Sequence, residues 1–363
     1  MKTLNSLTLL CLSAVLFSCK KETAPQSANS GLRPDAGTLA TTMPETYSQT
    51  STFPVANTLG YYSGDFNGDG SSDVFQPYNN NGLLGIYVHQ IANGGSPTTL
   101  VNQTAGLNDA GALSIGFVVG DYDGDGRDDL IQCWNWQGQM ALNVLRSTGF
   151  SFVNTVENVM SKPATTIGLY PVDVDGDGKT DVAQLLSNGG QLRIIVYRST
   201  GSSFVEYSDD TMAQGSGSVG FFTDNLDSDS KTEIVQGWNN GGNLSYIVYH
   251  VVNGHYTQYF TGNTTQGAGN TGLIPIDFAG TSAPAMVQAW NENGRTSFFL
   301  YTIVWSPNTG VGLDYSLPQY FTTNQGAGNV AWLSVKRAGQ NNSVLQVWNN
   351  GGFVAFFKYT PTL

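Results

Sequence analysis

Residues 173–181, Asp-Val-Asp-Gly-Asp-Gly-Lys-Thr-Asp, run directly into the apolar segment 182–186, Val-Ala-Gln-Leu-Leu, and this combination recurs along the chain. The glutamine of the apolar segment marks each copy. It occurs at Gln76, Gln132, Gln184, Gln236, Gln288 and Gln346, at successive separations of 56, 52, 52, 52 and 58 residues. A nearly fixed period of this length is the signature of a repeat architecture. The sequence therefore predicts six structural repeats.

Each repeat contains four short apolar segments, which in the third copy are residues 167–172, 182–186, 192–197 and 204–207. They are rich in the β-branched and aromatic residues that favour strands. The Asn-Gly-Gly sequence at 188–190 supplies the positive φ angles that a tight hairpin requires. Four antiparallel strands per repeat correspond to one blade of a β-propeller. We therefore expect an all-β fold, a six-bladed β-propeller of four-stranded antiparallel blades.

The two ends of the repeat array indicate how the ring closes. The sixth copy reaches its third strand at 353–359, and the printed sequence stops at Leu363 without a fourth. Residues 52–55, Thr-Phe-Pro-Val, precede the first copy and occupy the position of an outermost strand. Pro54 is compatible with an edge strand, though not with a central one. The N-terminal segment is thus predicted to complete the last blade and cover its edge.

The first residues have the features of an export signal, with Lys2 followed by an apolar run that is too short to span a membrane. The stretch Leu-Phe-Ser-Cys at 16–19 resembles the lipobox of bacterial lipoproteins, which implies diacylation of Cys19; an ordinary secretory peptide is the alternative. The charged sequence that follows is similar to the start of Bacteroidetes-type lipoproteins, which implies surface display. We expect a signal peptide at 1–18, a flexible tether at 19–49 and the propeller at 50–363. The protein would then be exported and lipid-anchored to the outer membrane through Cys19.

An acidic loop joins the first and second segments of each of the first three repeats, at residues 65–73, 121–129 and 173–181. Oxygen-bearing side chains stand at loop positions 1, 3, 5 and 9, a main-chain carbonyl is available at position 7, and Gly at position 6 permits a sharp bend. Hard all-oxygen ligation of this kind suits Ca²⁺. The predicted ligands are Asp65, Asn67, Asp69, Ser71 and Asp73; Asp121, Asp123, Asp125, Arg127 and Asp129; and Asp173, Asp175, Asp177, Lys179 and Asp181.

The fourth loop is predicted to be a weaker calcium site. It keeps oxygens at the same positions but has Ser230 in place of Gly, and its candidate ligands are Asn225, Asp227, Asp229, Lys231 and Glu233. The corresponding segments of the fifth and sixth repeats lack the acidic pattern and are not expected to bind calcium. EF-hands are excluded because position 12 is the repeat glutamine instead of a bidentate Glu, and strands flank the loop. Solvated acidic turns are the alternative, but their carboxylates would repel one another without a cation.

These loops and the four-strand period resemble the FG-GAP or VCBS repeat family, whose propellers include integrin heads, certain lectins and some polysaccharide lyases. The resemblance covers roughly residues 52–363. It implies the propeller and the calcium sites, whereas the same fold serves many activities.

Aromatic and amide side chains repeat at the turns between the second and third strands, which share one face with the connections between repeats. Such a combination suits sugars, whose C–H faces stack on aromatic rings and whose hydroxyls bond to amides. The candidate glycan-binding residues are Trp134, Trp238, Asn239, Trp290, Asn291, Trp348 and Asn349. The alternative is that the tryptophans pack between blades and the asparagines only form turns.

Three classes of function remain open at this stage: a glycan-binding module, an adhesion scaffold that binds a cell-surface or extracellular protein, and a carbohydrate-active enzyme such as a polysaccharide lyase. The three histidines do not indicate a catalytic centre, since His250 takes a slot held by Arg in repeats two and three, and His89 matches a tyrosine position. A net charge of −12 argues against nucleic acid as a partner.

Overall fold

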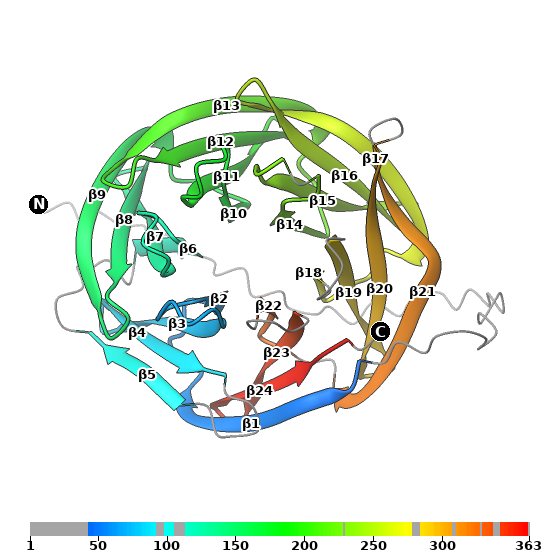
Figure 1. Cartoon of the computed structure of the whole chain (residues 1–363), viewed down its shortest axis with the longest axis horizontal. Coiled ribbons are helices and arrows are strands. Elements are labelled where there is room, and N and C mark those ends of the chain that lie inside the picture. Colours follow the sequence, from blue (N-terminus) through cyan, green and yellow to red (C-terminus); the bar gives the residue numbers. More distant parts are fainter. Residues whose placement is uncertain are drawn as a thin grey trace, which may run out of the picture. The chain divides into compact units, whose positions relative to one another are not determined.

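The computed structural model describes residues 43–91, 98–104, 113–227, 229–277, 284–306, 310–326, 329–336 and 342–361. These residues form six four-stranded antiparallel sheets that surround a central axis as blades (Figure 1). The prediction of an all-β, six-bladed propeller is confirmed. The described part of the chain contains no helix that could cross a membrane. The predicted signal peptide, Cys19 and the tether as far as residue 42 lie outside the described residues.

Strands A to D of each blade run from the axis outward. Blades one and two consist of β2 (Tyr62–Gly64), β3 (Asp73–Asn80), β4 (Leu83–Gln90) and β5 (Thr98–Gln103), and of β6 (Ser114–Gly120), β7 (Asp129–Trp136), β8 (Gln139–Ser147) and β9 (Phe152–Pro163). Blades three and four consist of β10 (Gly168–Val172), β11 (Asp181–Asn188), β12 (Gln191–Ser199) and β13 (Phe204–Gly215), and of β14 (Gly220–Asp224), β15 (Glu233–Asn240), β16 (Asn243–Val252) and β17 (His255–Gly267). Blades five and six consist of β18 (Gly272–Asp277), β19 (Pro284–Glu292), β20 (Arg295–Ser306) and β21 (Gly310–Gly326), and of β22 (Ala331–Val335), β23 (Ser343–Asn350), β24 (Phe353–Tyr359) and β1 (Glu45–Pro54).

The ring is closed by β1, which pairs with β24 as the outermost strand of blade six (Figure 1). Pro54 therefore lies on an edge, where its missing N–H costs no ladder hydrogen bond. Phe53 of the same strand contacts Tyr87 of blade one, with the ring centroids 4.6 Å apart. Closure by the N-terminal strand is thus as predicted, although β1 begins at Glu45, ahead of the expected boundary at residue 50.

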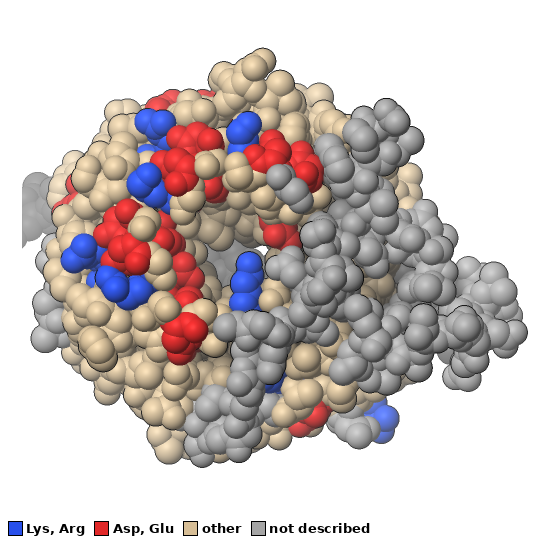
Figure 2. Space-filling model, viewed as in Figure 1, with Lys and Arg blue, Asp and Glu red and all other residues tan. Residues whose placement is uncertain are grey.

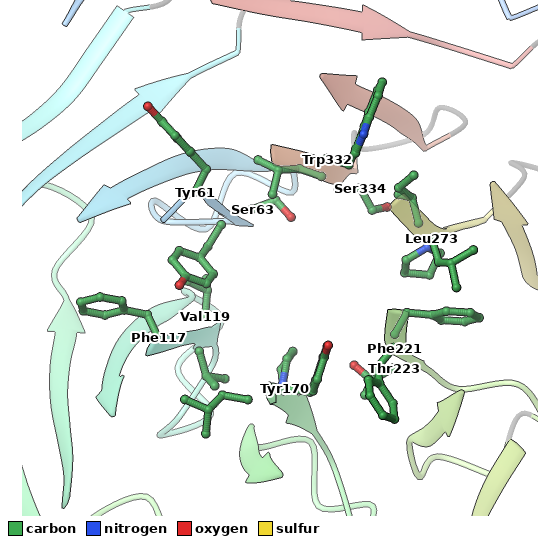
Figure 3. A pocket seen from close by; sticks show the side chains of 18 residues that line it. Tyr61, Ser63, Phe117, Val119, Tyr170, Phe221, Thr223, Leu273, Trp332 and Ser334 are labelled. Atoms are coloured by element: carbon green, nitrogen blue, oxygen red, sulfur yellow. The ribbon is translucent and has the colours of Figure 1, made fainter. Parts of the chain in front are cut away.

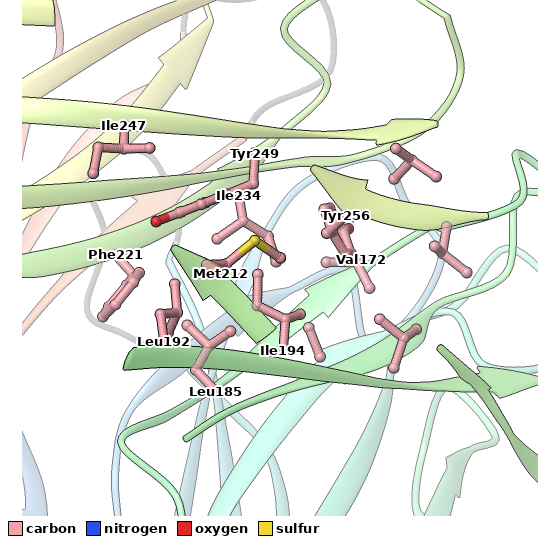
Figure 4. Packing of buried hydrophobic residues seen from close by; sticks show 14 residues of the cluster. Val172, Leu185, Leu192, Ile194, Met212, Phe221, Ile234, Ile247, Tyr249 and Tyr256 are labelled. Atoms are coloured by element: carbon pink, nitrogen blue, oxygen red, sulfur yellow. The ribbon is translucent and has the colours of Figure 1, made fainter. Parts of the chain in front are cut away.

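The blades are held together by apolar side chains from their facing sides. Between blades three and four, Leu185 and Ile194 pack in one cluster with Phe221, Ile234 and Ile247 (Figure 4). Full burial of an aliphatic or aromatic side chain of this size contributes roughly 1.5–3 kcal/mol. The core is therefore distributed around the ring as a series of layers between neighbouring blades.

The glutamine that marks each repeat is buried in all six blades, with at most 1% of its surface exposed. Gln184 donates from Nε2 to the carbonyls of Pro163 and Thr165, both at 2.8 Å, in the connection from the preceding blade. Its Oε1 accepts a hydrogen bond from the Tyr197 hydroxyl at 2.5 Å. Gln76 makes the equivalent bond to the Pro54 carbonyl at 2.9 Å. The repeat glutamine therefore ties each of these blades to the strand before it, including the junction where the ring closes.

Candidate metal loops and binding face

The acidic loops between strands A and B bring their carboxylates together on one face of the propeller (Figure 2). Ligand atoms of Asp121, Asp123 and Asp129 lie within 4.8 Å of one another in blade two. The equivalent carboxylates of blade three do the same. These two groups, and a third in blade four, could hold metal ions.

The first aspartate of each loop shapes the backbone around this cluster. In blade three, Asp173 Oδ1 accepts from the Gly176 N–H at 2.7 Å, and Oδ2 accepts from the Gly178 N–H at 2.9 Å. Gly178 has a φ of 82°, which a side chain would oppose. Asp65 of blade one accepts from the Gly68 and Gly70 N–H groups in the same way, at 2.8 and 2.7 Å. The backbone of loop one is therefore folded around its first aspartate in the same way as that of loop three.

The last aspartate of each loop is buried and surrounded by other carboxylates. Burial, with the neighbouring charges, raises the pKa of Asp73 and Asp129 to about 8 and that of Asp181 to about 7. Asp181 accepts from the Val174 and Ser199 N–H groups at 2.9 and 2.7 Å. Asp73 Oδ2 has no hydrogen-bond partner among the described residues. Such carboxyl groups are stabilised either by a proton or by a bound cation.

The side chains at position 7 turn back onto the carboxylate at position 5. Lys179 Nζ lies 2.7 Å from Asp177 Oδ2, and Arg127 pairs with Asp125. In blades two and three, position 7 can therefore contribute to a metal site only through its main-chain carbonyl, as the sequence suggested. In blade one, the carboxylate at position 5 is bonded from position 3, where Asn67 Nδ2 donates to Asp69 Oδ2 at 3.2 Å.

Position 8 has a role that the sequence did not reveal. The Thr180 N–H donates to the Asp121 carbonyl of the preceding blade at 2.7 Å, and the Asp128 N–H donates to the Asp65 carbonyl at the same distance. Ser72 of blade one is linked in this way to Lys336 of blade six, at 2.9 Å. Each loop thus holds the first residue of its neighbour. The signal was an oxygen-bearing side chain at this position in all four acidic loops.

Blade four departs from this arrangement. Ser230 takes the place of Gly with a φ of 70°, so the bend is kept. His250 Nδ1 lies 3.3 Å from Asp227 Oδ2 and 3.2 Å from Glu233 Oε1. Lys231 lies 3.9 Å from Asp229. In blade five, residues 278–282 lie outside the described residues, as do residues 337–341 of blade six.

The hairpins between strands B and C form the opposite face of the ring, together with the connections from strand D to the next strand A. The Ser216 and Ala268 N–H groups of these connections donate to the Gly190 and Gly242 carbonyls of the hairpins, at 2.7 and 2.9 Å. We call this surface the B–C face. The turns between strands C and D lie on the loop side, where Ser147 Oγ donates to the Phe66 carbonyl at 2.6 Å.

The predicted tryptophans divide into two groups on this face. Trp134 is only 8% exposed and packs with Ala141, so it belongs to the core. Trp238, Trp290 and Trp348 remain partly exposed. A Cβ added to Gly267 would lie 2.9 Å from Trp290, so this ring rests on the glycine backbone of the connection.

The predicted asparagines are exposed and form the turns. The Oδ1 atoms of Asn239, Asn291 and Asn349 accept from glycine N–H groups at 2.7, 2.9 and 2.8 Å. Within the described part of the chain, their Nδ2 groups donate no hydrogen bond. The structure thus shows the turn role of these asparagines through their oxygen atoms, and their role in binding a ligand stays a prediction.

A channel of about 300 Å³ follows the axis and is lined by three consecutive residues of each blade, which lie on strand A except for Tyr61, the residue just before β2 (Figure 3). Its wall includes Tyr61, Tyr170 and Trp332, and no charged side chain is among its described lining residues. Burial raises the pKa of Tyr61 and Tyr170 to about 12. Both phenols are therefore protonated near neutral pH.

No family model and no curated protein sequence matches the chain. Among solved structures, the exotype rhamnogalacturonan lyase YesX aligns with 87% of this chain and 75% of its own, at 11% identity and a TM-score of 0.45. The rhamnogalacturonan lyase YesW aligns with 88% of this chain and 75% of its own, at 12% identity and a TM-score of 0.42. A Bacillus licheniformis rhamnogalacturonan lyase aligns with 83% of this chain and 71% of its own, at 11% identity and a TM-score of 0.41. With TM-scores below 0.5, these alignments carry no argument about activity.

Proposed function

We propose that this protein is a calcium-stabilised propeller that binds glycans through its B–C face. The observation that carries the proposal is the repeated pairing of a partly exposed tryptophan with an exposed asparagine in blades four, five and six. The pairs are Trp238 with Asn239, Trp290 with Asn291, and Trp348 with Asn349.

Each pair offers what a sugar ring needs. An aromatic ring provides a flat apolar surface for C–H groups. In blades five and six, the rings of Trp290 and Trp348 also pack against the backbone of Gly267 and Gly326, which holds them in one orientation. The asparagine amide nitrogen provides a donor for a hydroxyl group. Because the asparagine oxygen is held by its own turn, the donor is fixed in place before a ligand arrives, which lowers the entropic cost of binding.

We assign calcium to the loops of blades one, two and three. The support is a set of oxygen ligands at regular positions, together with buried carboxylates whose raised pKa values indicate the need for a counter-charge. These loops lie on the face opposite to the tryptophans, so calcium would stabilise the ring and its blade-to-blade contacts without contacting the glycan.

The route of the chain supports an anchored arrangement with the B–C face directed outward. Glu45 at the start of β1 pairs with Tyr359, whereas Pro54 at its end pairs with Phe353 beside the B–C hairpin. Strand β1 therefore begins on the loop side of the propeller. We propose that the protein is exported and held at the outer membrane through lipidated Cys19, with the B–C face turned toward its ligand.

A protein ligand is the second candidate. Leu83 and Phe353, at the tips of the B–C hairpins of blades one and six, are 46% and 47% exposed. Exposed apolar residues at such positions are common in interaction surfaces. A polysaccharide lyase would need a base and a charge neutraliser, and the described channel lining offers neither.

The test is a glycan array probed with the full chain in calcium, alongside the double variant Trp238→Ala and Trp290→Ala. We expect binding to a defined set of glycans and its loss in the variant. Phe150→Ala is the matched control, because Phe150 is an 88% exposed aromatic residue in a turn on the loop side. An array without hits, or hits that the double variant retains, would refute the glycan proposal and leave the protein ligand.

A further inference from the structure

Beside the acidic loop of blade four, strand β16 supplies a nitrogen ligand, His250, that blades two and three lack at this position. A ring nitrogen of His250 and carboxylate oxygens of Asp227 and Asp229 lie within 4.8 Å of one another. The carboxylate of Glu233 is fully buried and lies 3.2 Å from Nδ1 of His250. The Asp227 side chain is 5% exposed and that of His250 is 17% exposed. Three different segments of the blade thus place four metal-ligating groups in one partly enclosed position.

The same slot at the end of strand C holds arginine in the two preceding blades. Arg146 lies 3.3 Å from Asp123, and Arg198 lies 3.1 Å from Asp175. A guanidinium group stays protonated and cannot ligate a metal ion. Those arginines offset the negative charge of the loop carboxylates from the protein surface, since their side chains are 43% and 37% exposed. His250 is shorter, lies deeper and offers a ring nitrogen that binds metal in its neutral form.

Both the nitrogen ligand and the residue at position 1 weaken this loop as a calcium site. Position 1 is Asn225, so one carboxylate of the other loops is missing. Calcium prefers six to eight oxygen ligands in a flexible shell, and a nitrogen ligand does not suit it. Imidazole combined with carboxylates is instead the ligand set of zinc and its neighbours in the first transition series.

We propose that His250, Asp227 and Asp229, backed by Glu233, form a binding site for a divalent transition metal of the zinc type. Zinc takes His nitrogen and carboxylate oxygen at about 2.0–2.2 Å in a tetrahedral shell. Ligand atoms around such an ion lie within roughly 4 Å of one another, so the observed group needs only a small contraction. The propeller therefore carries two kinds of metal site, with calcium in loops one to three and a zinc-type ion in loop four.

The test uses Co²⁺ as a spectroscopic probe on the full chain, stripped of metal and then saturated with Ca²⁺ so that the all-oxygen loops are filled. We expect a visible absorption band that saturates at a single equivalent of Co²⁺ per chain and disappears when Zn²⁺ is added. His250→Asn should abolish the band. His255→Asn is the matched control and should retain it, because His255 is an exposed histidine that lies 2.8 Å from a different carboxylate, Asp210.

A second variant keeps the test decisive if His250→Asn does not fold. His250→Arg introduces the residue that blades two and three have at this position. This variant should fold in the presence of calcium, and it should also lose the Co²⁺ absorption band. The proposal is overturned if calcium prevents Co²⁺ binding, or if the band persists in a folded His250 variant.

Discussion

Gln184 and its counterparts show how one side chain can join three parts of the propeller. Each amide is buried. Among the described residues, it donates to the preceding connection in blades one, three, four, five and six, and it accepts from a tyrosine on strand C in blades three to six. A buried polar group is costly unless it is bonded, so these glutamines help to specify which strands meet.

Replacing Gln184 by Leu should lower the free energy of unfolding by about 3 kcal/mol, because the Pro163 carbonyl, the Thr165 carbonyl and the Tyr197 hydroxyl lose a buried partner. Urea unfolding in calcium measures the change. Gln191→Leu is the control, since Gln191 is exposed and blade one has Leu83 at the aligned position. A loss no larger than that of the control would contradict the role of the glutamine.

His89 occupies the tyrosine position of blade one and is 1% exposed. Its Nε2 lies 2.8 Å from Gln76 Oε1, and burial lowers the pKa of His89 to about 4. Between this value and the ordinary one near 6.5, the unfolded chain binds a proton that the folded protein excludes. The free energy of unfolding should therefore fall on acidification, by about 2 kcal/mol from about pH 7 to about pH 5.

The variant His89→Tyr isolates this contribution. Tyrosine is the residue that blades three to six have at this position, and it should keep the hydrogen bond to Gln76. It does not titrate between pH 5 and pH 7. Urea unfolding at both pH values, with calcium held constant, should show a smaller decrease on acidification than in the parent. Equal decreases in the two proteins would show that His89 does not contribute.

At the scale of the loops, calcium and protons compete for the same carboxylates. Without a cation, the pKa of Asp73, Asp129 and Asp181 is raised to between about 7 and about 8, above the unfolded-state values. These groups therefore destabilise the calcium-free fold progressively as the pH rises from their unfolded-state pKa of about 4 to these raised values. Bound calcium removes this loss because it replaces the proton.

The shift in Tm on adding calcium should consequently increase from about pH 6.5 to about pH 8.5. At a hundredfold excess over Kd, each site should contribute about 2.7 kcal/mol. Thermal melts in EDTA and in calcium at each pH, with magnesium as the control cation, measure the shift in Tm. A calcium shift that is absent, or equal with magnesium, would contradict the assignment.

Strand β1 is the element on which closure depends. Deleting residues 1–42 should leave the melting temperature unchanged, because β1 remains. Deleting residues 1–55 removes the outer strand of blade six and the carbonyl that Gln76 binds, and should abolish cooperative unfolding or cause aggregation through the exposed edge. Similar melting curves for the two truncations would show that β1 is dispensable.

The elements were largely predictable from sequence, and their mutual contacts were not. Blade number, hairpin positions and N-terminal closure follow from spacing and turn chemistry, which are local. The partner of Gln184 lies in the preceding connection, and His250 meets Asp227 only after strand C has folded back along strand B. Trp134 shares its pattern with Trp238, but the packing around blade two buries it. Such differences depend on neighbours that no repeat pattern specifies.

At the scale of the whole molecule, the two faces of the ring carry different chemistry. One face gathers carboxylates in loops that hold neighbouring blades together (Figure 2). The other presents tryptophan and asparagine on hairpins whose backbone is fixed by the adjacent connection. We infer that stability is controlled mainly from the loop face and ligand binding from the B–C face.

The most direct test of this division is calorimetric titration of one glycan identified on the array, at a temperature at which every protein is folded. The double variant Trp238→Ala and Trp290→Ala should lose binding, whereas Asp175→Asn in loop three should bind with unchanged affinity although its Tm is lower. Loss of affinity in Asp175→Asn, with binding retained in the tryptophan variant, would place the ligand on the loop face and contradict the account.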